Sequence, residues 1–321
     1  MTGRSLLVIG GTGFFGKSIL DAARRGLLSP WHIDRITVVA RHTQVLIDRF
    51  PELLGPRVRL VDADAGTATL PAADYVIHAA SSTDARRYRD DPAGERANIV
   101  AAIDNYCAVA AATHRDSRIV YCSSGAVYGV QPAELDALAE DHGWTAETGL
   151  VDDKRAYAEA KRLAEARIAM LGSTGVRVAV ARCFAFVGAY LPRDQHFAIG
   201  NFLGDALAGR PVTVKAQHAV WRSYMHADDL VRWLMQLADH ASPACPVVNV
   251  GSDEAALVGD VAQRVARCFD AVADVPGITE TAVDRYVPSI ARAHSLGMTA
   301  AFGLDAAIAD MADRLRQTPL H

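Results

Sequence analysis

Short apolar segments alternate with longer helical patterns through residue 183, and this alternation limits the possible folds more than any other feature of the chain. The apolar segments are rich in β-branched residues, as expected of strands that are buried on both faces. They cover residues 5–10, 35–40, 57–62, 74–80, 117–124 and 175–183, and the main helical patterns cover residues 14–25, 95–113 and 154–171. The alternation predicts a doubly wound α/β fold, a parallel sheet with helices on both faces that binds ligands at the carboxyl ends of its strands.

The alternation weakens after residue 185, where glycine and proline interrupt the chain. A further strand is expected at residues 246–251 and a closing helix near 304–316. We therefore expect residues 1–184 to form the sheet domain and residues 220–252 to return to it. Residues 185–219 and 253–321 are expected to form a smaller, interleaved C-terminal lobe.

Composition excludes several classes of protein. The chain has 321 residues, half of them hydrophobic, which is enough for a large core. Its net charge of -4 is spread over interspersed acidic and basic residues, so neither nucleic acid nor a membrane surface is expected as a partner. The apolar run at the amino terminus is too short for a signal peptide, and no run approaches the roughly 20 residues of a membrane span. Five widely spaced cysteines favour reduced thiols in a cytoplasmic protein, and their spacing predicts no metal site.

A glycine-rich motif, "VIGGTGFFGKSIL", follows the first predicted strand and opens the first helix. Gly10, Gly13 and Gly16 would let the backbone turn tightly and approach a pyrophosphate, whose charge would lie at the amino terminus of the helix. The same glycines could serve only a tight turn. Their position at the start of a βαβ series favours dinucleotide binding instead.

The end of the second predicted strand indicates which dinucleotide is bound. Proteins that prefer NAD place a carboxylate there for the ribose hydroxyls, whereas an arginine accommodates the 2′-phosphate of NADPH. This strand ends in "VVARHT", which puts Arg41 at that point. An arginine at a strand end could also be merely solvated. We expect NADPH, with NAD as the alternative.

The stretch "RAYAEAK" places Tyr157 and Lys161 about one helical turn apart, on the same face of a helix. A free tyrosine titrates near pH 10, so a phenol that exchanges protons at neutral pH needs a positive charge nearby. Lys161 could supply that charge. Spacing alone is also compatible with an ordinary solvated helix face.

Over nearly its whole length the chain resembles the extended short-chain dehydrogenases/reductases of the NAD-dependent epimerase/dehydratase family. The motifs that carry the resemblance are Gly10, Gly13 and Gly16, "VIHAAS" at 76–81, Asn98, "YCSSGAVYG" at 121–129, Tyr157 with Lys161, and "RSYMHADDL" at 222–230. Residues 248–252 and 286–298 also resemble the carboxyl-terminal lobe of members that act on nucleotide sugars. The resemblance implies a Rossmann domain and makes the smaller lobe the substrate-binding one.

The resemblance also implies a catalytic set. Tyr157 would be the acid and base, Lys161 would lower its pKa and hold the nicotinamide ribose, and Ser124 would hydrogen-bond the substrate oxygen. Ser123 is the rival of Ser124. We favour Ser124 because it stands five residues before Gly129, as in the family's motif. Alternatively, the hydroxyls of both serines at the end of the strand would only cap the following loop.

Further contacts are implied by the same resemblance. The cofactor-binding residues would be Gly10, Gly13, Phe14, Phe15, Gly16, Arg41, Asp62, Ala79, Ala80, Asn98, Tyr157 and Lys161. The substrate-binding residues would be Ser81, Ser123, Ser124, His196, Phe197 and Arg222. Many epimerases have an asparagine for the substrate diphosphate where this chain has Ala185, which makes Arg222 the candidate for that contact. His196 could equally be a surface histidine, and Phe197 a core residue.

The residues after Ser124 help to choose among reactions. Dehydratases that resemble this chain have an acidic pair there, whereas this chain has Gly125 and Ala126. Reduction or 4-epimerisation of a nucleotide sugar remains, and Arg41 favours an NADPH-dependent reductase of a nucleotide-linked 4-keto-6-deoxyhexose. The alternatives are an NAD-dependent 4-epimerase and a dinucleotide-sensing regulator without catalysis. A homodimer is expected, since relatives pair through helices that correspond to 95–113 and 154–171.

Overall fold

The computed structural model of the chain describes residues 3–143 and 150–317. The chain forms two compact units. The first, called the sheet unit here, consists of Met1–Val127, Leu150–Cys183 and Val231–Val248. The second, called the smaller unit, consists of Tyr128–Gly149, Phe184–Leu230 and Asn249–His321.

A seven-stranded sheet with the order β11-β6-β5-β4-β1-β2-β3 is the centre of the fold. Its strands are β1 (Arg4–Ile9), β2 (Ile33–Ala40), β3 (Val58–Asp62), β4 (Tyr75–His78), β5 (Arg118–Ser124), β6 (Arg177–Cys183) and β11 (Val247–Val250). The pairings of β1 with β2 and β4, of β2 with β3, and of β5 with β4 and β6 are parallel. The strand order reverses beside β1, which is where doubly wound sheets bind their ligands. The predicted α/β fold class is confirmed.

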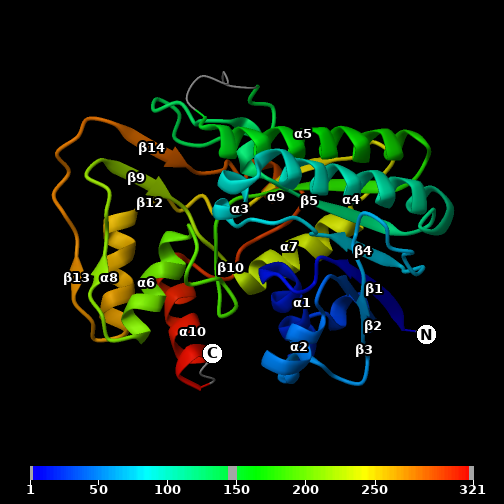
Figure 1. Cartoon of the computed structure of the whole chain (residues 1–321), viewed down its shortest axis with the longest axis horizontal. Coiled ribbons are helices and arrows are strands. Elements are labelled where there is room, and N and C mark those ends of the chain that lie inside the picture. Colours follow the sequence, from blue (N-terminus) through cyan, green and yellow to red (C-terminus); the bar gives the residue numbers. More distant parts are fainter. Residues whose placement is uncertain (1–2, 144–149, 318–321) are drawn as a thin grey trace. The chain divides into compact units, whose positions relative to one another are not determined.

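Helices α4 (Pro92–Thr113) and α5 (Asp152–Ser173) lie side by side against one face of the sheet (Figure 1). Tyr106 of α4 and Ile168 of α5 are fully buried in the same core as the strand residues Val76 and Ile119. Helix α1 (Phe14–Arg24) lies on the other side of the sheet (Figure 1). Strand β1 is thus covered on both faces, which explains its unbroken apolar sequence.

The remaining elements are divided between the two units. In the sheet unit they are η1 (Ser29–Trp31), α2 (Gln44–Arg49), η2 (Pro51–Leu53) and α3 (Ala85–Asp90). The chain passes from one unit to the other within η3 (Gly125–Tyr128) and within α7 (Ala227–Asp239). Strand β7 (Phe186–Val187) follows the point where the chain re-enters the smaller unit. The smaller unit continues with α6 (Ala198–Leu207), β8 (Val212–Thr213), β9 (Ala219–Arg222), β10 (Met225–His226), β12 (Ala256–Leu257), α8 (Val258–Cys268), β13 (Ala273–Asp274), β14 (Val283–Tyr286), α9 (Ala291–Ser295) and α10 (Leu304–Gln317).

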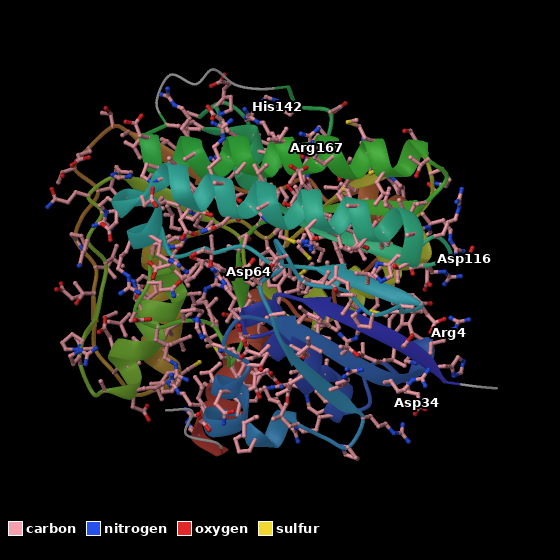
Figure 2. All side chains as sticks on the ribbon, turned by 45° about the vertical axis from the view of Figure 1, so that its right-hand side comes forward. Arg4, Asp34, Asp64, Asp116, His142 and Arg167 are labelled. Carbon is pink, nitrogen blue, oxygen red and sulfur yellow. The ribbon has the colours of Figure 1, made fainter. Side chains whose placement is uncertain are left out.

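The two edges of the central sheet are distinct in chemistry and position. Arg4 and Asp34, near the starts of β1 and β2, lie at one edge, and Asp64, beyond the end of β3, lies toward the other (Figure 2). At the first edge the Tyr75 hydroxyl accepts from Arg4 and donates to Asp239, over 2.9 and 3.0 Å. These bonds join the start of the sheet to the end of α7. The carboxyl edge is therefore the one left for a ligand.

The smaller unit contains a three-stranded sheet in which β9 pairs parallel with β14 and antiparallel with β12. Asn249, which belongs to the same unit, is fully buried. The Asn249 side chain donates to the carbonyl oxygens of Leu138 and Ser289 and accepts from the Tyr128 hydroxyl. One amide side chain thus joins three segments that are distant in the sequence.

The strands and the four long helices expected from the sequence are present within a few residues of their predicted bounds. Helix α5 continues through Gly172 to Ser173, and the glycine with a positive φ beyond its end is Gly175, at 95°. A Cβ on Gly172 would lie 2.8 Å from the carbonyl oxygen of Pro243, so that glycine permits a close backbone approach. Among the described residues, no helix is both long and apolar enough to cross a membrane.

Candidate active site

The glycine-rich turn after β1 is built into the carboxyl edge of the sheet. Gly10 has φ 90°, and a Cβ there would lie only 2.6 Å from the backbone nitrogen of Ala80. The Gly10 N–H donates to Val39 O, and the Ala79 N–H donates to Ile9 O, both over 2.8 Å. The ends of β1, β2 and β4 are therefore held together at this turn, and only glycine fits at its first position.

The next glycines have different surroundings. A Cβ on Gly16 would lie 2.1 Å from Gly11 O, so Gly16 is required for the helix to approach the turn. A Cβ on Gly13 would meet only Gly10 O, at 3.5 Å. Gly13 is the N-cap residue of α1 and brings no capping side chain to the helix start. The turn therefore presents bare backbone at the amino terminus of an 11-residue helix, which fits the pyrophosphate of a dinucleotide.

The loop after β2 carries Arg41, whose side chain is about half exposed. Its guanidinium lies 3.6 Å from the Asp64 carboxylate. Asp62, at the end of β3, accepts from the backbone N–H of Thr43 over 2.9 Å. His42, which stands between Arg41 and Thr43, has a positive φ of 58°. Asp62 thus orders the backbone next to Arg41, and Arg41 has a carboxylate as its neighbour.

Other residues predicted to contact the cofactor lie around this turn. Phe14 and Phe15 begin α1, with their ring centroids 5.9 Å apart. Ser81 lies just beyond the end of β4, and Asn98 is exposed in the second turn of α4. The structure places these residues in the sheet unit, and their contacts with a cofactor remain predictions.

Tyr157, in the first turns of α5, meets two serines from the ends of two strands. Hydrogen bonds join its hydroxyl to the side chains of Ser124, at the end of β5, and Ser81, after β4. Burial raises the pKa of Tyr157 to about 12, and these two hydrogen bonds act in the opposite direction. The ring of Tyr88 packs edge-on against Tyr157 with centroids 5.3 Å apart. In this arrangement the phenol is protonated at neutral pH.

Lys161 lies one turn further along α5 and is almost completely buried, with 2% of its surface exposed. Its ammonium donates to Cys122 O over 2.8 Å and lies 5.8 Å from the centroid of the Tyr157 ring and 5.0 Å from that of Tyr121. Burial lowers the pKa of Lys161 to about 8. The predicted pair therefore consists of a buried lysine and a partly buried tyrosine, and it is not a solvated helix face.

Ser123 has a different partner from Ser124. Its hydroxyl donates to the Glu165 carboxylate over 2.5 Å, and Arg182 donates to the same carboxylate over 2.8 Å. Ser124 is thus the serine that meets Tyr157, whereas Ser123 meets Glu165, further along α5. Glu165 was not predicted from the sequence, although its spacing of four residues from Lys161 places it on the same helix face.

The predicted substrate residues of the smaller unit lie in two places. His196 and Phe197 directly precede α6, and their ring centroids are 4.2 Å apart. Arg222, at the end of β9, donates to the Asp284 carboxylate of β14 over 2.7 Å and to Trp221 O over 2.8 Å. His196 and Arg222 thus belong to different elements of the smaller unit, and their substrate contacts stay predictions.

A doubly wound sheet, a glycine turn shaped for a pyrophosphate, and a partly buried tyrosine with a buried lysine on one helix face define a dinucleotide-dependent enzyme of the short-chain dehydrogenase/reductase type. The chain belongs to the NAD dependent epimerase/dehydratase family, whose family model matches residues 6–251. The resemblance seen in the sequence is thereby confirmed.

Relatives with known activities have low sequence identity to this chain. UDP-glucuronic acid decarboxylase 6 of Arabidopsis thaliana is 22% identical over 286 residues, which cover 87% of this chain and 78% of that protein. The solved UDP-N-acetylglucosamine 4-epimerase of Methanobrevibacter ruminantium M1 is similar with a TM-score of 0.81 at 16% identity, covering 99% of this chain and 100% of that one. A dTDP-glucose 4,6-dehydratase of Streptomyces venezuelae, solved with NAD bound, has a TM-score of 0.80 at 19% identity and the same coverage. These structures share the fold with this chain.

The glycine turn yields a prediction with a matched pair of variants. Gly10→Ala should destabilise the fold, because alanine at a strained φ costs about 1–3 kcal/mol and the added Cβ would also collide with the backbone of Ala80. Gly13→Ala should leave the thermal unfolding temperature nearly unchanged and weaken dinucleotide binding, because its Cβ would occupy the space above the helix start. Thermal unfolding and titration with NADPH measure the two effects. Normal dinucleotide binding by Gly13→Ala would place the pyrophosphate elsewhere.

Proposed function

We propose that this protein is an NADPH-dependent reductase of a nucleotide-linked 4-keto-6-deoxyhexose. The observation that carries the proposal is the state of Tyr157, whose hydroxyl is held by Ser124 and Ser81 and has a pKa of about 12. A phenol that is protonated before the reaction is suited to donate a proton to the alkoxide that forms when a ketone is reduced. A 4-epimerase would use the same group to remove a proton from a sugar hydroxyl in one half-reaction and to return a proton in the other.

The residues of the sheet unit would have the following roles in the reaction. Bound NADPH would supply the hydride, with its pyrophosphate at the glycine turn and its ribose near Lys161. Ser124 would donate a hydrogen bond to the substrate carbonyl and polarise it, and Tyr157 would deliver the proton to that oxygen. The backbone N–H of Ala126 donates to the Ser124 oxygen over 3.2 Å and so orients this side chain at the end of β5.

The positions after Ser124 argue against a dehydration. Eliminating water from a sugar needs an additional acid and base close to the reacting carbons. Gly125 and Ala126 occupy the positions that directly follow Ser124, and neither has a side chain that can transfer a proton. Hydride transfer with a single proton donor is the chemistry that these side chains support.

Arg41 supports NADPH as the cofactor. It stands at the end of β2, where the adenine ribose of a dinucleotide would lie, and a 2′-phosphate would be a stronger partner for a guanidinium than the half-exposed Asp64. NAD is the alternative, since Asp64 lowers the positive charge at this point. The solved dehydratase from Streptomyces venezuelae contains NAD.

For the nucleotide sugar we propose Arg222 as the group that binds the diphosphate. Its guanidinium is bound to the Asp284 carboxylate, an anion that a diphosphate could replace. His196 and Phe197 are proposed as further substrate contacts. A UDP-sugar or dTDP-sugar is the class of substrate named for the solved relatives.

Two expectations about the whole protein remain part of the proposal. A homodimer is expected through α4 and α5, which already lie side by side within the chain. A cytoplasmic location fits the five cysteines, all of which have free thiols. Sedimentation of the purified protein would test the first expectation.

The alternatives are an NAD-dependent nucleotide-sugar 4-epimerase and a dinucleotide sensor without catalysis. Incubation with NADPH and a nucleotide-linked 4-keto-6-deoxyhexose separates the three. A reductase consumes one NADPH for each product molecule, an epimerase converts nucleotide sugars without net consumption, and a sensor binds without turnover. Mass spectrometry of ligands that co-purify with the protein would identify the cofactor and the nucleotide.

The proton donor can be tested with Tyr157→Phe, which keeps the ring and removes the transferable proton. The variant should fold and bind NADPH normally, while turnover falls by roughly a hundredfold to ten-thousandfold. Lys161→Met should slow turnover and also weaken NADPH binding, and the double variant should be little slower than Tyr157→Phe alone at saturating NADPH. Turnover of Tyr157→Phe near the wild-type rate would contradict the assigned role.

Cofactor choice can be tested with two substitutions of opposite effect. Arg41→Asp should weaken NADPH far more than NADH, because it puts a negative charge next to the 2′-phosphate. Asp64→Asn should strengthen NADPH binding and change NADH binding little, because it removes the competing carboxylate. Dissociation constants for both cofactors provide the measurement. Equal effects on NADPH and NADH would rule out Arg41 as the phosphate contact.

The proposed diphosphate contact can likewise be tested with two substitutions of opposite effect on the KM for the nucleotide sugar. Arg222→Ala should raise the KM for the nucleotide sugar with little change in NADPH affinity, because it removes a group that binds the diphosphate. Asp284→Asn should lower that KM, because the Arg222 guanidinium would no longer have to break an ion pair before it binds the diphosphate. Steady-state kinetics at saturating NADPH would measure both. If neither variant changes the KM, the diphosphate is bound by other residues.

A further inference from the structure

The segment that joins β4 to α3 brings Ser81 to Tyr157 and has no regular structure of its own. Residues 79–84 lie between the two elements, outside any helix or strand. Among the described residues, no hydrogen bond between backbone groups holds residues 81–83. The Ser81 side chain is nevertheless hydrogen-bonded to the Tyr157 hydroxyl. Contacts other than a backbone ladder must therefore place Ser81 against Tyr157.

Tyr88 supplies such a contact from α3. Its hydroxyl donates to the carbonyl oxygen of Ser82 over 3.0 Å. Ser82 directly follows Ser81, so this bond fixes the peptide next to the serine that meets Tyr157. Burial raises the pKa of Tyr88, so its hydroxyl keeps its proton and remains a donor.

The ring of Tyr88 also contacts Tyr157 directly. The two rings pack edge-on, with centroids 5.3 Å apart and an angle of 76° between their planes. Edge-to-face packing is a favoured and directional arrangement of aromatic rings. Tyr88 therefore restricts the phenol of Tyr157 in two ways, through its own ring and through the segment that carries Ser81.

Tyr88 is itself held in place by its surroundings. It is 3% exposed and belongs to the core that α4 and α5 form against the sheet. Helix α3 begins with the Asp84 carboxylate, which accepts from the backbone N–H of Arg86 over 3.0 Å. The Arg87 guanidinium pairs with the buried carboxylate of Glu95, on α4, at 3.1 Å. Helix α3 is thus fixed at its start and to α4, with Tyr88 as its buried side chain.

We propose that Tyr88 is a positioning residue for Tyr157: its ring and its hydrogen bond to Ser82 keep Tyr157 and Ser81 in contact, so that the phenol has one orientation toward the substrate. Tyr88 acts through these neighbours and has no contact of its own with the reacting atoms. The catalytic part of this role rests on the proposed function of Tyr157 as a proton donor. Such a role matters because a displacement of about 1 Å can lower a rate by about a hundredfold.

The position of Tyr157 tests the proposal without any reaction. Crystal structures of the wild-type protein, Tyr88→Phe and Tyr88→Leu would give the distance between the hydroxyl oxygens of Ser81 and Tyr157. In the wild type this distance should be about 2.5–3.0 Å, as in a hydrogen bond. In Tyr88→Phe, which loses the bond to Ser82, it should exceed about 3.5 Å. In Tyr88→Leu, which also loses the ring contact, the Tyr157 ring should turn as well.

Tyr106→Phe is the matched control. Tyr106 is a fully buried tyrosine of the same core, and its hydroxyl has no hydrogen-bond partner among the described residues. Removing that hydroxyl should leave the distance between Ser81 and Tyr157 at its wild-type value. A wild-type distance in both Tyr88 variants would overturn the positioning role. Failure of Tyr88→Phe to fold would also overturn it, because the hydroxyl would then support the fold as a whole.

Turnover tests the catalytic part of the role. Tyr88→Phe should lower kcat roughly tenfold and leave the KM for the nucleotide sugar and the NADPH dissociation constant unchanged, because only the proton donor is displaced. The same substitution should cause no further loss in Tyr157→Phe, which already lacks the hydroxyl through which Tyr88 acts. Tyr106→Phe should keep the wild-type kcat. Equal losses from Tyr88→Phe in both backgrounds would indicate a general structural effect and overturn the positioning role.

Wild-type protein that reduces no 4-keto sugar would contradict the proposed function. The distance between Ser81 and Tyr157 in the variants would then still decide whether Tyr88 positions the phenol. Wild-type protein that reduces the sugar, together with an unchanged kcat in Tyr88→Phe, would leave the proposed function standing and contradict the role of Tyr88.

Discussion

The hydrogen bond from the Lys161 ammonium to the carbonyl of Cys122 is the interaction on which the candidate active site depends. An ammonium buried to this degree is unfavourable unless polar partners surround it. Here the partners are the strand carbonyl and two tyrosine rings. Because α5 brings Lys161 and Tyr157 together, the same contact fixes the helix where Tyr157 reaches Ser124. Burial thus shifts the pKa of both side chains, and their contacts with β5 fix their positions.

Phosphate groups would be bound in this chain by local groups and not by its net charge. The net charge of -4 offers no general attraction for a dinucleotide or a nucleotide sugar, so local groups must hold their phosphates. The backbone of the glycine turn is one such group. Arg41 and Arg222 are the proposed others, and each has an aspartate as its present partner, Asp64 and Asp284. Phosphate must replace a carboxylate at each arginine, which favours ligands whose charge matches both groups well.

The sequence predicted those parts of the fold that depend on local pattern. The strands buried on both faces, the glycine turn at Gly10 and the face shared by Tyr157 and Lys161 all follow from spacing within one or two elements. The cluster of Ser123, Glu165 and Arg182 could not be predicted, because it depends on the register of β5 with β6 and on the position of α5 across both. Asp284 was missed for the same reason, since it meets Arg222 across the pairing of β14 with β9. Contacts between distant segments require the pairing that only the folded chain shows.

The central claim, that the protein reduces a sugar ketone with a proton from its own tyrosine, is tested most directly by isotope transfer. The reaction would use NADPH carrying two deuterium atoms at C4 of the nicotinamide, so that transfer from either face carries the label, and a nucleotide-linked 4-keto-6-deoxyhexose, with the product analysed by mass spectrometry and NMR. The account predicts one deuterium atom on C4 of the sugar for each NADP formed. A product without deuterium at C4, or conversion of the sugar without formation of NADP, would contradict it.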